Sequence, residues 1–339
     1  MATMIGNISP SAGRSPIFID APTIRSVLPY RSLINHLQTS LAAASSVIQS
    51  PIRHSHQTSS SSTLLLMPSW SLSSTTLPYI GVKLVTTHPN NSALNLPGVH
   101  ASYVLFNSVT GETLASMDGT ELTLRRTACV SAVASHYLSN KNSRVLLSVG
   151  AGSLAPHLIK AHLTTRPGIN HVMIWNRTSQ KSKKLVEEIG KESGMEGVRF
   201  EVCEDIAPAA AMADIVSCAT NSETPLVLGK WLKAGAHLDL VGSYKPSMME
   251  CDDEAVKRGR VFVDNEAALV EAGELVGAFE RGVMKEDEVA GDLVGLIKGE
   301  KIGRKEEIEN TVFVSVGSAV VDLLSAQLVY ETITTKRSN

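Results

Sequence analysis

The run Gly150-Ala151-Gly152-Ser153-Leu154-Ala155 spaces its small residues as a dinucleotide phosphate loop does. It follows the apolar run 145–149 and opens a stretch with helical periodicity. Gly150 would allow a tight turn, Gly152 would let the backbone approach a pyrophosphate, and Ala155 would allow close packing of helix on strand. The free N–H groups at the helix start favour the anion. The residues of this loop that we assign to cofactor binding are Gly150, Gly152, Ser153, Leu154 and Ala155.

The next predicted strand ends at Trp175 and is followed by Asn176-Arg177-Thr178. A site for NAD usually has Asp or Glu here, to bind the ribose 2′-OH. Asn176 is neutral and Arg177 is cationic, which suits a 2′-phosphate, unless Arg177 merely caps the strand. We therefore predict NADPH as cofactor, with NADH as the alternative. Candidate cofactor residues around and beyond this strand end are Asn176, Arg177, Thr178, Thr220 and Val241.

Strands and helices alternate around these residues at the spacing of a doubly wound parallel sheet. Near-continuous apolar runs are typical of strands buried on both faces. The predicted fold class is therefore α/β, with a Rossmann-type dinucleotide-binding domain over residues 127–311. Its strands are predicted at 145–149, 172–175, 198–202, 215–219, 237–241 and 261–263, with helices at 155–163 and 179–189.

The region before it reads as an α+β unit with an antiparallel sheet. A helix pair broken near Pro29 is expected between Ile24 and Leu41, and the polar run 58–62 is expected to be a loop. Strands are predicted at 63–68 and 80–86, followed by a hairpin of 99–106 and 113–117 that turns at Thr110-Gly111. The tail 315–332 has a helical pattern and is expected to pack on this region. We predict a substrate and dimerisation domain of residues 16–126 plus 312–335.

Composition argues against several classes of protein. The formal net charge of the 339 residues is −2, and Lys181, Lys183 and Lys184 fit the polar face of one helix, so no basic surface predicts nucleic-acid binding. No apolar run approaches the roughly 20 residues that span a bilayer. The cysteines lack metal or disulfide spacing and are interpreted as free thiols in a reducing compartment. They are Cys129, Cys203, Cys218 and Cys251.

The first 19 residues contain no acidic residue, several serines and Arg14. This composition is compatible with a short transit peptide. The fold is expected to begin near Phe18, so residues 1–15 are either a targeting segment, with plastid as destination, or an untargeted end of a cytoplasmic protein.

Further motifs, in order and spacing, resemble the ornithine cyclodeaminase/mu-crystallin family over residues 16–332. Their combination is far more specific than any one of them. They are 81–85, 117–119, 121–123, 126–128, the glycine loop, 174–178, 235–237, 241–242, 311–313, Gly317 and Asp322.

The resemblance gives roles to residues that would otherwise pass as ordinary surface residues. It implies that Arg53 and Arg126 bind a substrate carboxylate and that Lys83 is the active-site lysine. The chemistry fits these roles, because a guanidinium matches a planar carboxylate with two parallel hydrogen bonds. A buried lysine beside two arginines is expected to have a lowered pKa.

Within the family the chain is most similar to ketimine reductases of the mu-crystallin type, in particular to plant members that make pipecolate from dehydropipecolate in lysine breakdown and defence signalling. The resemblance implies NADPH-dependent reduction of a cyclic imine carboxylate, such as piperideine-2-carboxylate. Hydride would reach the imine carbon while Lys83 supplies or holds the imine proton. Family members generally pair through the sheet of the first domain, which implies a homodimer.

The chain departs from the family pattern at three positions. Cyclodeaminases carry an acidic residue where this chain has Tyr244, which we keep among the catalytic candidates. Val314 replaces a frequent lysine, and Leu154 replaces the usual glutamine. The alternatives are an ornithine cyclodeaminase, a non-catalytic NADPH-binding protein, and an amino-acid dehydrogenase that releases ammonia. Histidines interpreted as structural or surface residues are His88, His100, His136 and His237.

Overall fold

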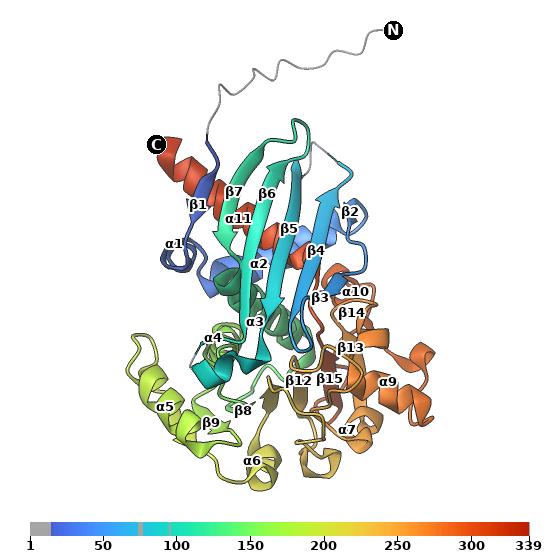
Figure 1. The fold of residues 1–339 in the computed structure, drawn as a ribbon. Helices are drawn as coiled ribbons and strands as arrows, with labels where there is room; N and C mark the ends of the chain where they lie inside the picture. The colour runs from blue at the N-terminus through green and yellow to red at the C-terminus, as the bar shows by residue number, and fades with distance from the viewer. Residues whose placement is uncertain (1–14, 74–76, 95, 339) are drawn as a thin grey trace.

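The computed structural model describes residues 15–73, 77–94 and 96–338. Apart from Ser15, the predicted N-terminal segment 1–15 lies outside the described residues. The described chain is built around two sheets, which we call the first and the second sheet, and Figure 1 shows them stacked end to end. All four cysteines are free thiols. Within the described ranges, no helix is long and apolar enough to cross a membrane.

The first sheet has seven strands in the order β1-β7-β6-β5-β4-β2, with β3 also paired to β4. Strands β4 to β7 pair antiparallel, as the sequence predicts, and the short β1 joins β7 in parallel. The strands are β1 (Ile17–Ile19), β2 (Ile48–Gln49), β3 (His54–Gln57), β4 (Thr63–Ser71), β5 (Tyr79–Thr87), β6 (Val99–Asn107) and β7 (Thr113–Asp118). A 3₁₀ turn, η1 (Pro89–Leu94), precedes β6.

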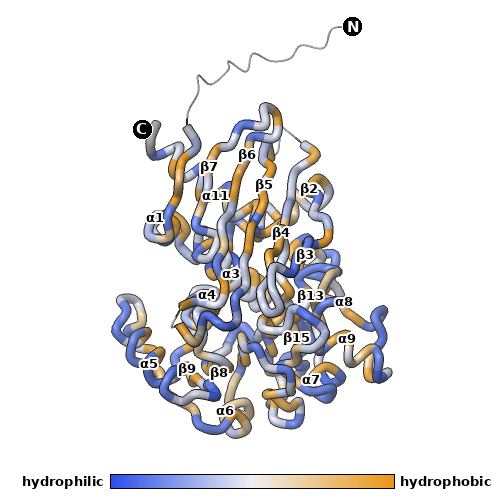
Figure 2. Tube along the Cα trace, in the orientation of Figure 1, coloured by the Kyte–Doolittle hydropathy of each residue, from blue (hydrophilic) through white to orange (hydrophobic). Residues whose placement is uncertain are grey.

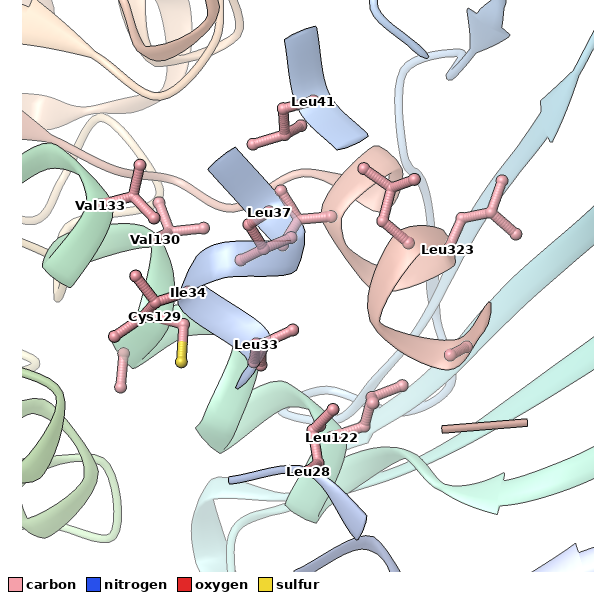
Figure 3. Close-up of a cluster of buried hydrophobic side chains, with 14 of the residues drawn as sticks. Leu28, Leu33, Ile34, Leu37, Leu41, Leu122, Cys129, Val130, Val133 and Leu323 are labelled. Atoms are coloured by element: carbon pink, nitrogen blue, oxygen red, sulfur yellow. The ribbon is translucent and has the colours of Figure 1, made fainter. Parts of the chain in front are cut away.

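Four helices cover one face of the first sheet: α1 (Ala21–Val27), α2 (Tyr30–Ala44), α3 (Gly119–Leu138) and α11 (Ala319–Ser338). The first two are the predicted pair broken near Pro29. Figure 3 shows Leu33 and Leu37 of α2 beside Val130 of α3 and Leu323 of α11 in one buried cluster. Because side chains alternate across a strand, every second residue of β5 from Tyr79 to Val85 faces these helices and is buried.

The opposite face of the first sheet carries apolar residues that are partly exposed. Ile80, Val82 and Leu84 of β5 point to this side, and their cross-strand partners include Trp70 of β4 and Val104 of β6. Figure 2 shows hydrophobic residues along these strands. Within the described residues no helix packs on this face, so we call it the open face.

The second sheet is parallel throughout, in the order β10-β9-β8-β11-β12-β15-β13-β14. Chain order reverses between β8 and β11, which confirms the predicted Rossmann-type sheet. Its strands are β8 (Val145–Val149), β9 (His171–Trp175), β10 (Arg199–Val202), β11 (Ile215–Cys218), β12 (His237–Leu240), β13 (Gly259–Val263), β14 (Gly291–Asp292) and β15 (Asn310–Val314).

Strand β15 was not predicted from the sequence, and its residues extend the second sheet as far as Val314. It lies between β12 and β13 and pairs with both. The tail helix therefore begins at Ala319 rather than at residue 315, after a non-helical stretch in which Gly317 has a φ of 86°. The division into domains at residues 126 and 312 stays a prediction.

Helices and short 3₁₀ turns connect the strands of the second sheet. They are α4 (Ala155–Thr165), α5 (Ser179–Gly190), α6 (Ile206–Met212), η2 (Gly229–Trp231), α7 (Asp253–Arg258), α8 (Ala268–Glu271), α9 (Gly273–Glu280), η3 (Glu286–Glu288) and α10 (Leu293–Lys298). His237 is fully buried on β12, and its Nδ1 lies 2.9 Å from Thr311 Oγ1. This location agrees with the structural role expected for that histidine.

Candidate active site

Two adjoining cavities lie at the carboxyl ends of β8 and β11, where the second sheet meets the first. The larger has a volume of about 530 Å³, and the smaller a volume of about 250 Å³. The walls of both include Gly152, Ala219, Thr220 and Asn221, so the two form one continuous cleft. Ligands of open α/β sheets bind at this kind of position, beyond the strand ends where the chain order reverses.

The glycine loop has the geometry that a dinucleotide requires. Gly150 has a φ of 110°, and a Cβ there would lie 2.7 Å from the carbonyl oxygen of Ala219. A Cβ at Gly152 would meet nothing within 4 Å and would project into the cleft. Leu154 precedes α4 without capping it through a side-chain hydrogen bond. The Ala155 and His157 amides of α4 donate to the carbonyls of Gly152 and Leu154 (3.1 and 3.0 Å), and Pro156 has no N–H. Among the described residues, the amides of 152–154 have no protein acceptor, so these loop N–H groups can meet a pyrophosphate at the start of the helix.

The smaller cavity is lined by Asn176, Arg177 and Thr178, the residues after β9 that the sequence predicts to meet the cofactor ribose. Asn176 links it to the glycine loop, since its Oδ1 accepts a hydrogen bond of 3.1 Å from the Ala151 amide. Its Nδ2 donates to the carbonyl of Thr178 at 3.0 Å. The wall also carries Arg177 and Lys181, both exposed, and no described carboxylate. Lys181 was interpreted from the sequence as a helix-surface residue, and the structure adds it to the cavity.

The floor of the larger cavity is fixed by a carboxylate that the sequence did not reveal. Glu250 Oε1 accepts hydrogen bonds from the Thr220 amide (2.6 Å) and from Thr220 Oγ1 (2.8 Å). Its Oε2 accepts one from the Gly242 amide at 2.7 Å. The loops after β11 and β12 are thereby tied together, which positions Thr220 and Val241 in the wall. Tyr244 also lines the cavity and is 42% exposed.

A buried cluster of charges lies behind the opposite wall. Lys83 of β5 is 2% exposed, and its Nζ lies 2.8 Å from Asp322 Oδ2 of α11. The other oxygen, Oδ1, lies 2.8 Å from Nε of Arg126 on α3. Burial and the nearby Arg126 lower the pKa of Lys83 to about 8, although Asp322 opposes this shift. Burial raises the pKa of Asp322, but the two cations outweigh it and lower that pKa.

Arg126 lines the larger cavity itself. Its terminal nitrogens lie beside Gly317, where a Cβ would come within 3.0 Å of Nη1. The amide of Gly317 donates to Asp264 Oδ2 at 2.8 Å, which holds the segment in place. The guanidinium is thus fixed through Nε on Asp322, while its fork lies at the cavity wall. This is the arrangement in which an arginine binds a carboxylate through two nitrogens.

Arg53 lies apart from this cluster. Its Nη2 lies 2.6 Å from Glu271 Oε2, at the end of α8, and donates to the carbonyl oxygen of Val316 at 3.1 Å. Neither Arg53 nor Lys83 is among the described residues that line the larger cavity. The structure therefore brings Lys83 and Arg126 together on Asp322 and leaves Arg53 engaged by a carboxylate of the protein.

The fold and cleft define a dinucleotide-binding protein in which the first sheet contributes a buried lysine, and helix α3 a buried arginine, to the site. The chain belongs to the ornithine cyclodeaminase/mu-crystallin family, whose model matches residues 16–337. Membership confirms the resemblance noted from the sequence.

Known proteins resemble this chain over almost its whole length. Protein SAR DEFICIENT 4 of Arabidopsis thaliana is 55% identical over 317 residues, which are 94% of this chain and 97% of that protein. Δ1-pyrroline-2-carboxylate reductase of Thermococcus litoralis, solved with NADH and L-proline, has a TM-score of 0.88 and 29% identity, covering 94% of this chain and 98% of that one. An archaeal alanine dehydrogenase dimer with bound NAD has a TM-score of 0.84 and 28% identity, covering 95% and 97%.

Proposed function

We propose that this protein is an oxidoreductase that reduces the C=N bond of a cyclic imine carboxylate with a nicotinamide cofactor, and that piperideine-2-carboxylate, reduced to pipecolate, is its substrate. The observation that carries the proposal is the buried Lys83–Asp322–Arg126 cluster at the wall of a cleft that continues to the glycine loop. The solved relative that holds NADH and L-proline, a cyclic amino acid, supports it.

The charges of the site match such a substrate. The Lys83–Asp322–Arg126 cluster has two cations and one anion, which leaves one net positive charge for a carboxylate, and Arg53 is paired with Glu271. The fork of Arg126 binds this carboxylate and places the adjacent imine carbon in the cleft. A second contact from Arg53 requires that the substrate replace Glu271. A bound reduced nicotinamide supplies the hydride.

Lys83 handles the proton of the reaction. A protonated imine accepts a hydride far better than a neutral imine does. A general acid positioned to supply this proton typically increases the rate by about 10²–10⁴-fold. A lysine with a pKa near 8 is poised for this exchange near neutral pH. Tyr244 stands where cyclodeaminases have an acidic residue, and a tyrosine side chain does not replace a carboxylate, so the site favours reduction over ornithine cyclisation.

The proposal is tested by following NADPH absorbance with piperideine-2-carboxylate, with ornithine in a parallel reaction. We expect rapid NADPH oxidation with the imine and no proline from ornithine. Formation of proline without net cofactor consumption would instead identify a cyclodeaminase. Turnover of an open-chain keto acid with ammonium would identify an amino-acid dehydrogenase, and tight NADPH binding without any turnover would identify a binding protein.

We propose NADPH as the preferred cofactor, because Arg177 and Lys181 flank the ribose cavity without an opposing carboxylate. Replacing Arg177 by alanine is expected to raise the KM for NADPH roughly tenfold, since one charge-assisted contact to the 2′-phosphate is lost. The KM for NADH should stay unchanged. The Lys184→Ala variant removes a charge from α5 outside the cavity and serves as control. Equal effects of Arg177→Ala on both cofactors would contradict the preference.

We also propose a homodimer that pairs through the open face of the first sheet, as the dimer of the archaeal relative and the unpartnered apolar residues suggest. Val82 lies between Pro68 and Val104 on this face. Val82→Lys is expected to give monomers in analytical ultracentrifugation, because a charge would be buried without a partner. Val109→Lys, in an exposed loop, is the control. A Val82→Lys protein that remains dimeric would place the interface elsewhere.

For the location in the cell we propose the plastid, on the acid-free, serine-containing composition of residues 1–19. A fusion of these residues to a fluorescent protein is expected to accumulate in plastids. Fluorescence that stays in the cytoplasm would support the alternative.

A further inference from the structure

Asp322 occupies a central position that the proposed reaction does not by itself explain. Its side chain is 0% exposed on α11, and each carboxylate oxygen faces a different cation at 2.8 Å. One cation comes from β5 and the other from α3, so Asp322 joins the first sheet to the helix that carries Arg126. A buried carboxylate is costly unless it is paired, and here both of its partners are residues of the proposed site.

We propose that Asp322 is the positioning residue of this site: it holds Arg126 by Nε so that the fork of the guanidinium faces the substrate carboxylate, and it stabilises the ammonium form of Lys83 by ion pairing. The inference rests on the proposed function, because it assigns to Arg126 and Lys83 the roles given above. Asp322 is not a catalytic residue in this account, since it acts through its two partners.

The surroundings of Lys83 make Asp322 decisive for its charge. Arg126 faces Lys83 from α3 and Arg53 from the segment before β3, and both disfavour a further positive charge. Tyr103 of β6 is paired directly opposite Lys83 and is fully buried, and burial raises the pKa of its phenol, which keeps it neutral. Among the described residues, Asp322 is the anion in contact with Lys83. Without it, burial and two arginines would act on the lysine unopposed.

The geometry of Arg126 depends on the same carboxylate. Among the described residues, Arg126 donates no hydrogen bond to the protein, and its Nε lies 2.8 Å from Asp322 Oδ1 as an ion pair, so this ion pair is the contact that restrains the plane of the guanidinium. Bidentate binding of a carboxylate requires this plane to be fixed. Without the contact to Asp322, Arg126 would keep its positive charge, but the orientation of its guanidinium would no longer be restrained.

The test compares the pH profiles of kcat/KM for piperideine-2-carboxylate in the wild type and in Asp322→Asn, which keeps the size and removes the charge. The basic limb of the Asp322→Asn profile is expected to lie at least one pH unit lower than that of the wild type. At high pH, each unit of this shift corresponds to a loss of about tenfold in kcat/KM. The KM for the imine is expected to rise as well. Glu121→Gln is the matched control, because Glu121 is a buried carboxylate on α3 that pairs two other arginines, Arg25 and Arg125. Its basic limb should not move.

If the basic limb of Asp322→Asn lies at the same pH as that of the wild type, the inference is overturned. If the wild type itself does not reduce the imine, the proposed function is overturned instead. NADPH fluorescence shows whether Asp322→Asn is folded. If this variant does not bind NADPH, Asp322→Glu decides, since it keeps the charge but displaces both cations. We then expect a basic limb near that of the wild type and a raised KM, and an unchanged KM would contradict the positioning role.

Discussion

Replacing Lys83 by alanine is expected to lower kcat/KM for imine reduction by about 10²- to 10⁴-fold, the contribution of a positioned general acid. The variant removes the cation that Asp322 holds at 2.8 Å and with it the proton for the imine nitrogen. Arg126 still neutralises the other oxygen of Asp322, so we expect the protein to fold. Steady-state kinetics with a fixed saturating NADPH concentration measure the loss.

The control for this variant is cofactor binding, since the glycine loop lies on the second sheet and does not contact Lys83. NADPH should bind to Lys83→Ala as to the wild type. In the wild type, kcat/KM should fall as the pH rises through about 8, because the donor is the ammonium form and burial lowers its pKa to that value. Wild-type turnover in Lys83→Ala would remove Lys83 from the mechanism.

The second large effect is expected at Arg126. Arg126→Ala should reduce kcat/KM by about 10²- to 10³-fold, because two charge-assisted hydrogen bonds to the substrate carboxylate are lost. Most of the loss should appear in KM. Arg126→Lys keeps the charge but lacks the fork, so it should recover only part of the activity. Isothermal titration with pipecolate in the presence of NADP⁺ measures the binding part directly.

Arg53→Ala provides the comparison. Arg53 is held by Glu271 at 2.6 Å, so a substrate gains this contact only by displacing a carboxylate, and the net gain is smaller. We expect a weaker effect on KM than at Arg126. A larger effect of Arg53→Ala would mean that Arg53 is the principal carboxylate ligand and that the exchange with Glu271 is complete on binding.

The sequence was most informative where the determining contacts are local. The turn at Gly150, the approach of strand and helix at Ala155 and the strand–helix alternation depend on neighbouring residues, and each leaves a periodic or positional pattern. Strand β15 left no such pattern, because its apolar residues run into the tail, and its place between β12 and β13 is set by tertiary contacts.

The charged pairs of the site could not be predicted from the sequence either, because they too are formed by tertiary contacts. Lys83 meets Asp322, and Arg53 meets Glu271, across most of the length of the chain. Asp322 was visible as part of the family motif, but nothing local showed that it would hold two cations. No local pattern around Glu250 indicates a structural role, although its carboxylate accepts hydrogen bonds from the amides of both Thr220 and Gly242.

The central claim is that hydride passes from the nicotinamide to the imine carbon while the ring stays closed. The direct test is to incubate the protein with piperideine-2-carboxylate and NADPH deuterated at C4 of the nicotinamide, using both C4 epimers, and to analyse the product by mass spectrometry and NMR. We predict that one epimer gives pipecolate with a single deuterium on the carbon that bears the carboxylate. Pipecolate without deuterium from either epimer, or no pipecolate at all, would contradict the account.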